Sequence, residues 1–315
     1  MFNDVHSDFI LNPLTEVLSA GVCACSSLPV GIENSALGEY FMQSLFLRMT
    51  GAQEQKLKCV CWALATNDYK YRYDYLNKKQ YGECSDYKAK NDIYNDLFAL
   101  IRGINSKFTP FDAFSDIVLP DKKMVQMETQ WKRRVDGIRM KEAERAIEAQ
   151  KKKGAKLSPE AEEKIRVSFK SKPYPNQDWE AQVFNEKKAS FIKQVVADIV
   201  YLLEHSPLTA WNYREFLIFK EHWQDVLNSG QLLVKENELF ASKLQGYYRR
   251  LVYEHRNKTA HNTASYVKDM PTLGVLSDKG NVYNNYYFRF AILILIDEVF
   301  MRMFKRYREE GLKMV

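Results

Sequence analysis

The chain has 315 residues, enough to bury the core of one large domain or of two ordinary ones. Its hydrophobic fraction of 46% and aromatic fraction of 13% argue against disorder, and its 13 Gly and 9 Pro are too few for the many turns of a sandwich or barrel. The formal net charge of +6 is spread unevenly along the sequence. We therefore expect an all-α fold.

Two features of the sequence bear on a membrane location. The chain begins with an acidic stretch, Met1–Asp4, where a signal peptide would carry positive charge. The most apolar run, Ala291–Ile296, is closed by Asp297 and is far shorter than the roughly 20 residues that span a bilayer. We expect a cytoplasmic protein without membrane partners.

The five cysteines are an odd number for a disulfide framework, so reduced thiols are expected. Cys23 and Cys25, with Cys59 and Cys61, could be imagined as two halves of a zinc site. Their C-x-C spacing and apolar flanks instead favour buried thiols. No metal and no cofactor is predicted.

In the N-terminal part, apolar residues recur at helical spacing before and after Gly51, and they are Leu37, Phe41, Leu45, Leu57, Val60 and Leu64. Residues 69–75 differ, because tyrosines alternate there with charged residues at a period of two. That alternation predicts a short strand, as part of a half-buried hairpin or of an irregular core edge, and the alternative is a surface whose tyrosines stack on unpaired bases.

The segment 131–172 carries most of the excess charge, with 14 Lys and Arg against 7 Asp and Glu. Within it, Ser158 is a good helix N-cap, Pro159 suits the first helical position, and three glutamates follow in the first turn. We expect a charged, poorly buried pair of helices. Its face either contacts phosphates or is simply solvated.

After Pro175, three segments have the apolar spacing of core helices. The first segment carries Phe184, Phe191, Val195, Ile199 and Leu202. The second is expected to begin near Val234 and carries Phe240, Leu244, Tyr247 or Tyr248, and Leu251. The third is expected from about Asn284 and carries Phe288, Ile292, Leu295, Val299 and Met303. Together with the N-terminal part they predict a helical bundle. The expected organisation is an N-terminal bundle part (1–115), a basic helical insertion (116–178) and C-terminal bundle helices (179–315).

One short segment, Arg256-Asn257-Lys258-Thr259-Ala260-His261, has residue types suited to phosphate chemistry. An arginine holds phosphate oxygens with a planar fork, and a histidine exchanges protons near neutrality. Asn257 and His261 are one turn apart, so the amide could fix the imidazole tautomer. Spacing alone is weak evidence, because Arg249 and Arg250 precede His255 in a similar way.

Arg256 and His261 are five residues apart, about 140° around a regular helix. They can converge if the helix ends near Ala260, or if the same segment of a second subunit faces this one. A dimer would supply the acid and the base for attack of a ribose 2′-hydroxyl on its own phosphate, without a metal.

The pattern Arg-Asn-x-x-Ala-His at the end of a bundle helix resembles the RX4–6H motif of the HEPN superfamily of helical ribonucleases. The resemblance implies an all-α HEPN-like bundle, a homodimer with a composite site, and metal-independent RNA cleavage, often by a toxin or antiphage effector that a partner such as an antitoxin regulates. Arg256, Asn257 and His261 would be the catalytic residues. An acidic residue from another helix is also implied, but the sequence does not place it.

A second interpretation of these residues remains open. Arg256 could pair with a carboxylate while His261 is a helix-end histidine stabilised by the dipole, which gives a fold without catalysis. The chain would then be an inactive helical module that binds RNA or an acidic protein through its basic segment.

Overall fold

A computed structural model describes residues 5–30, 35–77, 84–153, 157–261 and 285–312. The described chain is predominantly helical, so the all-α prediction is confirmed, with one two-stranded hairpin as an exception. It divides into two compact units: unit 1 comprises residues 1–116 and 188–315, and unit 2 comprises residues 117–187. No helix in the described ranges combines the length and the apolar character needed to cross a bilayer.

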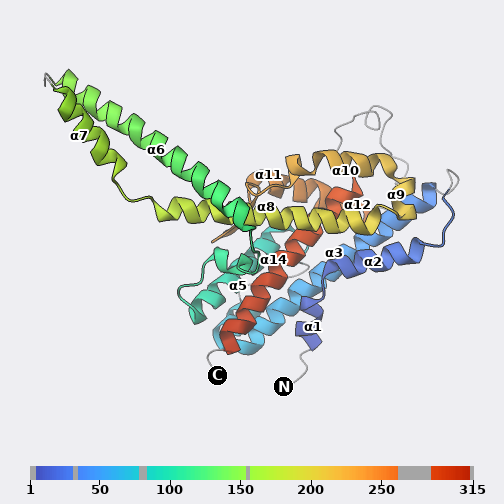
Figure 1. The fold of residues 1–315 in the computed structure, drawn as a ribbon. Coiled ribbons are helices and arrows are strands. Elements are labelled where there is room, and N and C mark those ends of the chain that lie inside the picture. Colours follow the sequence, from blue (N-terminus) through green and yellow to red (C-terminus); the bar gives the residue numbers. More distant parts are fainter. Residues whose placement is uncertain (1–4, 31–34, 78–83, 154–156, 262–284, 313–315) are drawn as a thin grey trace. The chain divides into compact units, whose positions relative to one another are not determined.

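Unit 1 contains most of the helices, which Figure 1 colours in chain order. They are α1 (Val5–Leu11), α2 (Leu14–Cys25), α3 (Ser35–Asn67), α4 (Tyr69–Asn77), α5 (Tyr87–Ile104), the short 3-10 helix η2 (Pro110–Phe114), α9 (Pro207–Trp211), α10 (Tyr213–Val226), α11 (Ser242–Tyr247), the π-helix η3 (Tyr248–Glu254), α12 (His255–His261) and α14 (Tyr286–Leu312). The strands are β1 (Leu232–Lys235) and β2 (Glu238–Phe240). α8 (Asn176–Leu203) begins in unit 2 and ends in unit 1.

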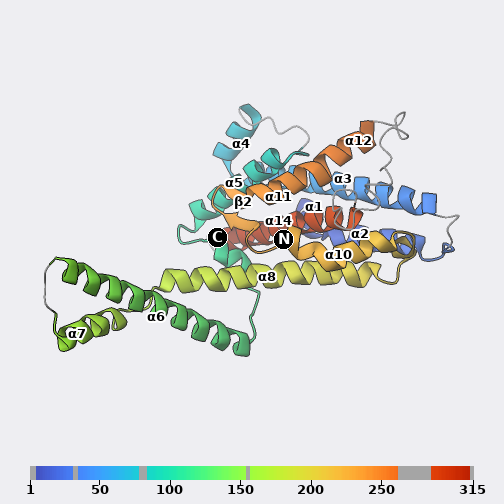
Figure 2. The ribbon, with the colours of Figure 1, turned by 90° about the horizontal axis from the view of Figure 1, so that it is seen from above.

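α14 is the central helix of unit 1. Every residue from Tyr286 to Ile296 is buried, which is expected of a helix that is apolar on all sides. It packs against α3, α5 and α10, and Figures 1 and 2 show it beside α3 and α5. The apolar spacing predicted a core helix from about Asn284, and this is confirmed.

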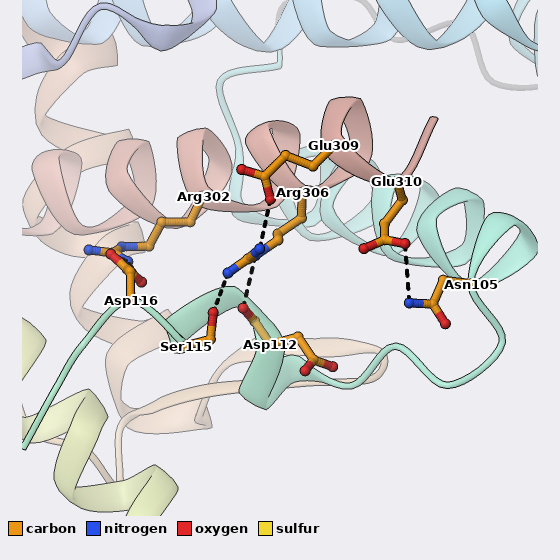
Figure 3. Close-up of polar contacts among 8 residues, drawn as sticks. All are labelled: Asn105, Asp112, Ser115, Asp116, Arg302, Arg306, Glu309 and Glu310. Carbon is orange, nitrogen blue, oxygen red and sulfur yellow. Dashed lines mark hydrogen bonds and ion pairs between the residues drawn. The ribbon is translucent and has the colours of Figure 1, made fainter. Parts of the chain in front are cut away.

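The C-terminal half of α14 forms polar contacts with the segment around η2 (Figure 3). Arg302 forms an ion pair with Asp116, with a closest nitrogen–oxygen distance of 2.5 Å. Arg306 donates to the backbone oxygen of Asp112 at 3.0 Å and contacts the Ser115 hydroxyl. These contacts hold the last residues of unit 1 before the chain enters unit 2.

The predicted strand or hairpin at residues 69–75 is wrong, because this segment forms α4. The Asp68 carboxylate accepts a hydrogen bond from the Tyr71 amide at 2.6 Å and so caps the new helix. Tyr71 and Tyr75 are one helical turn apart, and their rings stack with centroids 6.1 Å apart. A period of two also places residues at i and i+4, so seven residues do not separate a strand from a helix.

The helix expected near Val234 begins only at Ser242, because residues 232–240 form an antiparallel hairpin. Leu232 pairs with Phe240, and the register shifts at a bulge. Asn237 supplies the turn with φ 71°, in the left-handed region that asparagine tolerates better than most residues. Of the residues assigned to the helical stripe, only Phe240 lies in a strand, whereas Leu244, Tyr247, Tyr248 and Leu251 lie in α11 and η3.

Unit 2 contains α6 (Asp121–Lys152) and α7 (Pro159–Lys170), which pack against each other (Figure 2). The predicted cap is confirmed, since the Ser158 hydroxyl accepts from the Ala161 amide at 3.3 Å. α6 buries a stripe at four-residue spacing, consisting of Trp131, Val135, Arg139, Ala143 and Ile147, whereas α7 has no buried residue. The expected boundaries of the basic insertion, 115/116 and 178/179, compare with unit boundaries at 116/117 and 187/188.

Candidate functional site

The Arg256 motif lies on α12, the helix that directly continues a π-helical segment. Residues 248–254 form the π-helix, and α12 runs from His255 to His261. The helix therefore includes His261 rather than ending at Ala260. π-Helical segments are rare and frequently accompany functional sites, because they shift side chains around the helix axis.

Hydrogen bonds to Glu54 and Asn257 orient the Arg256 guanidinium. Its Nη2 donates to Oε2 of Glu54 on α3 at 3.3 Å, and its Nη1 donates to Oδ1 of Asn257 at 3.1 Å. The Arg256 side chain is 19% exposed and that of Glu54 is 12% exposed. The guanidinium is thus oriented by neighbours while part of it reaches solvent.

Asn257 and His261 complete the predicted set. The Asn257 amide oxygen orients Arg256, a role different from the expected one of fixing the His261 tautomer. The backbone of His261 closes α12, but its side chain lies outside the described part of the chain. The structure therefore brings Arg256 and Asn257 together and leaves the third position a prediction.

Glu54 was not anticipated, although the sequence contains a signal for it. The apolar stripe of α3 is interrupted at Thr50, Gln53 and Glu54, which occupy the same helical face as Leu57 and are nonetheless buried. Burying polar groups is costly unless they find partners. Gln53 donates to the backbone oxygen of Leu293 at 2.8 Å, and Glu54 pairs with Arg256.

A small pocket lies at this polar face. It is lined by Thr50, Gln53, Glu54, Ser85, Lys90, Tyr248, Val252, Tyr253, Arg256 and Leu293. Its free space corresponds to about one water molecule, which is too little for a nucleotide. Any larger ligand would have to approach Arg256 from the solvent side of this pocket.

Lys90 supplies a second cation to the pocket. The side chain is fully buried, and its ammonium donates to the backbone oxygen of Cys84 at 2.9 Å. Burial lowers the pKa of Lys90 to about 8, and the nearby Glu54 carboxylate partly opposes that change. The pocket thus combines one carboxylate with two basic side chains.

His255, the neighbouring histidine, has a different environment. Its ring packs against Phe46 with centroids 5.2 Å apart, and its Nε2 lies 3.2 Å from the Tyr286 hydroxyl, which in turn donates to Glu39. Burial, followed by the positive charges of Arg289 and Lys258, lowers the pKa of His255 to about 3. A histidine that stays neutral in this setting is better suited to packing than to exchanging protons near pH 7.

Across the described ranges, no group of three or more His, Cys, Asp or Glu residues is arranged to hold a metal ion, and all five cysteines are free thiols. Comparisons of the chain with protein-family models, curated proteins and solved structures found no match.

Proposed function

We propose that this protein is a metal-independent endoribonuclease of the HEPN type, acting as a homodimer. The observation that supports the proposal best is the arrangement of Arg256, which sits on a bundle helix, is oriented by Glu54 and Asn257, and remains partly exposed. An arginine placed in this way can bind a phosphate without first being ordered, which reduces the entropic cost of binding.

The proposed reaction is a transesterification within RNA. A base removes the proton of a ribose 2′-hydroxyl, whose oxygen attacks the adjacent phosphorus, and the bond to the 5′-oxygen of the next nucleotide breaks. That leaving oxygen takes a proton from an acid. His261 would exchange these protons, and Arg256 would stabilise the negative charge that develops on the phosphate.

Glu54 and Asn257 would act as positioning residues. The guanidinium has five N–H donors in a fixed plane, so a carboxylate on one nitrogen and an amide oxygen on another define the orientation of that plane. Glu54 would also be the acidic residue from another helix that the HEPN resemblance implies.

Helix geometry supports the proposed dimer. Arg256 and His261 belong to one continuous helix, on which five residues correspond to about 140°. Two copies of α12 facing each other would let the arginine of one chain and the histidine of the other act on the same phosphate.

The test is cleavage of labelled RNA by purified protein in EDTA. The expected products carry a 2′,3′-cyclic phosphate and a 5′-hydroxyl. His261→Ala and Arg256→Ala should each reduce cleavage at least about 100-fold, the scale of lost acid–base or charge stabilisation. His222→Ala and Arg249→Ala, which change exposed residues of the same types, serve as matched controls.

Circular dichroism and thermal unfolding should show that all four variants fold. Strict dependence on magnesium, or full activity in His261→Ala, would contradict the proposed mechanism. A toxin or antiphage role would in addition require that expression arrests growth, that the His261→Ala chain does not, and that a partner protein can neutralise the effect.

The second candidate is a catalytically inactive helical module that binds RNA or a protein. The Arg256–Glu54 ion pair favours it, because a carboxylate on the guanidinium competes with a phosphate. Protein that shifts RNA in a salt-dependent way and leaves it intact across pH 5–9 would support this function instead.

A further inference from the structure

Unit 2 holds most of the net charge of the protein. Residues 117–187 contain 17 Lys and Arg against 12 Asp and Glu, a net of +5, compared with +6 for the whole chain. The cations of unit 2 that lack an ion pair would contribute most to the attraction of an anionic partner, because paired charges contribute little.

Several cations are neutralised within the unit. Lys123, Lys132, Lys151 and Arg166 form ion pairs with Glu186, Glu128, Glu162 and Glu144 respectively. The Lys132 pair lies within α6, and the Lys151 and Arg166 pairs join α6 to α7.

Several exposed cations have no ion pair among the described residues, and four of these share one face of α6: Arg134, Lys141, Arg145 and Lys152. We call this set the α6 stripe. Arg134 is close to the neutral amide of Gln182, which leaves its charge uncompensated.

The α6 stripe follows one face of the helix. Successive spacings of 7, 4 and 7 residues keep the four side chains within about 40° of each other around the axis, over about 27 Å of helix length. The buried residues of α6 repeat every four residues on another face. Glu148 lies at the edge of the stripe and reduces its charge without removing it.

The stripe has cations and aliphatic neighbours but no base-stacking platform. Ile138 is the large apolar residue beside it and is 51% exposed, whereas Trp131, the one aromatic residue of α6, is 5% exposed. Proteins that hold single strands combine cations with exposed aromatic rings. A straight row of cations alone matches a regular phosphate backbone, which a duplex presents at about one charge per 1.7 Å.

We infer that the α6 stripe binds the phosphate backbone of double-stranded RNA without reading its sequence. The inference rests on the proposed function in one respect, since it assigns the substrate class of the nuclease. Binding by the α6 stripe requires neither Arg256 nor His261, so an experiment can refute the duplex-binding inference and the nuclease proposal independently.

The experiment measures the affinity of the full chain for a labelled 20-base-pair RNA duplex between 50 and 200 mM salt. All proteins carry His261→Ala, so that the probe stays intact. The test variant adds Arg134→Gln, Lys141→Gln, Arg145→Gln and Lys152→Gln. Each released contact should reduce the slope of log K against log salt by about 0.9, so the slope should fall by about 3.6.

A slope change of this size means that the unaltered stripe loses about 150-fold more affinity than the variant over the same salt range. The matched control replaces the four ion-paired cations Lys123, Lys132, Lys151 and Arg166 with Gln, which removes the same formal charge. Its slope should stay within about one unit of the parent.

An unchanged slope in the stripe variant would overturn the inference, and so would equal losses in both variants, which would indicate net charge rather than a defined face. Tighter binding of a single strand of equal length that survives the stripe substitutions would also overturn it. Stripe-dependent duplex binding together with no cleavage by the wild-type chain would refute the nuclease proposal and leave this inference standing.

Discussion

The buried ion pair between Lys56 of α3 and Asp297 of α14 gives the sharpest test of how unit 1 is held together. The Lys56 ammonium lies 2.8 Å from both carboxylate oxygens, and Asp297 also accepts from the Leu14 amide at 2.8 Å. Their side chains are 7% and 3% exposed. One carboxylate therefore joins α3, α14 and the start of α2.

Lys56→Met should destabilise the protein by about 3–5 kcal/mol, because it leaves a buried carboxylate without its counter-ion. Lys56→Met combined with Asp297→Asn should recover at least about 2 kcal/mol of that loss, since the asparagine is neutral and its amide oxygen can still accept from Leu14.

The loss of stability caused by Lys56→Met should also depend on pH. Burial raises the pKa of Asp297, and Lys56 opposes this, so removing Lys56 raises that pKa further. In the variant the folded chain then binds a proton at a pH where the unfolded chain does not. Its stability relative to wild type should therefore improve as the pH falls from 8 to 5.

The assay is urea unfolding followed by circular dichroism, with the wild type, both single variants and the double variant compared at pH 5 and pH 8. Additive losses in the double variant, or a Lys56→Met deficit independent of pH, would show that the pair is not coupled as its geometry indicates.

The remaining predictions concern a pair of glycines and a buried lysine. Gly38→Ala should destabilise the protein by about 1–3 kcal/mol, because the new Cβ would lie 2.7 Å from Trp211. Gly51→Ala in the same helix should instead stabilise the protein by about 0.5–1 kcal/mol, because the new Cβ would meet no atom within 4 Å. The denaturant midpoints of the two variants measure both effects. Between pH 7.5 and 9.5, the free energy of unfolding of the wild type should rise by about 2 kcal/mol relative to that of Lys90→Met. The reason is that Lys90, with a pKa of about 8, loses its proton in the folded chain at a lower pH than in the unfolded chain. A difference in unfolding free energy that does not change with pH would contradict this.

Apolar periodicity was sufficient to predict the long helices. The stripes of α8 and α14, and the cap at Ser158, depend on local spacing and on burial of one face, both of which are visible in the chain. The errors at residues 69–75 and 232–240 arose in short segments, where helix and strand periods overlap and tertiary contacts decide.

The candidate site was predicted only in part, because its residues come from distant positions. Arg256 and Asn257 were visible as a local motif, but the partnership with Glu54 joins residues 202 positions apart. The polar interruption of the α3 stripe indicated that something must satisfy those groups, without saying what. The π-helix leaves no comparable pattern in the sequence.

That π-helix determines how the chain tolerates changes in length. Its i→i+5 hydrogen bonds place more backbone in each turn than an α-helix has, so the number of residues in this segment sets the angle around the helix axis at which α12 begins. A single deletion within residues 248–254 would therefore turn Arg256 away from Glu54 while leaving every side chain of the motif intact. The site depends on the angle at which Arg256 projects from the helix axis as much as on the identity of its residues.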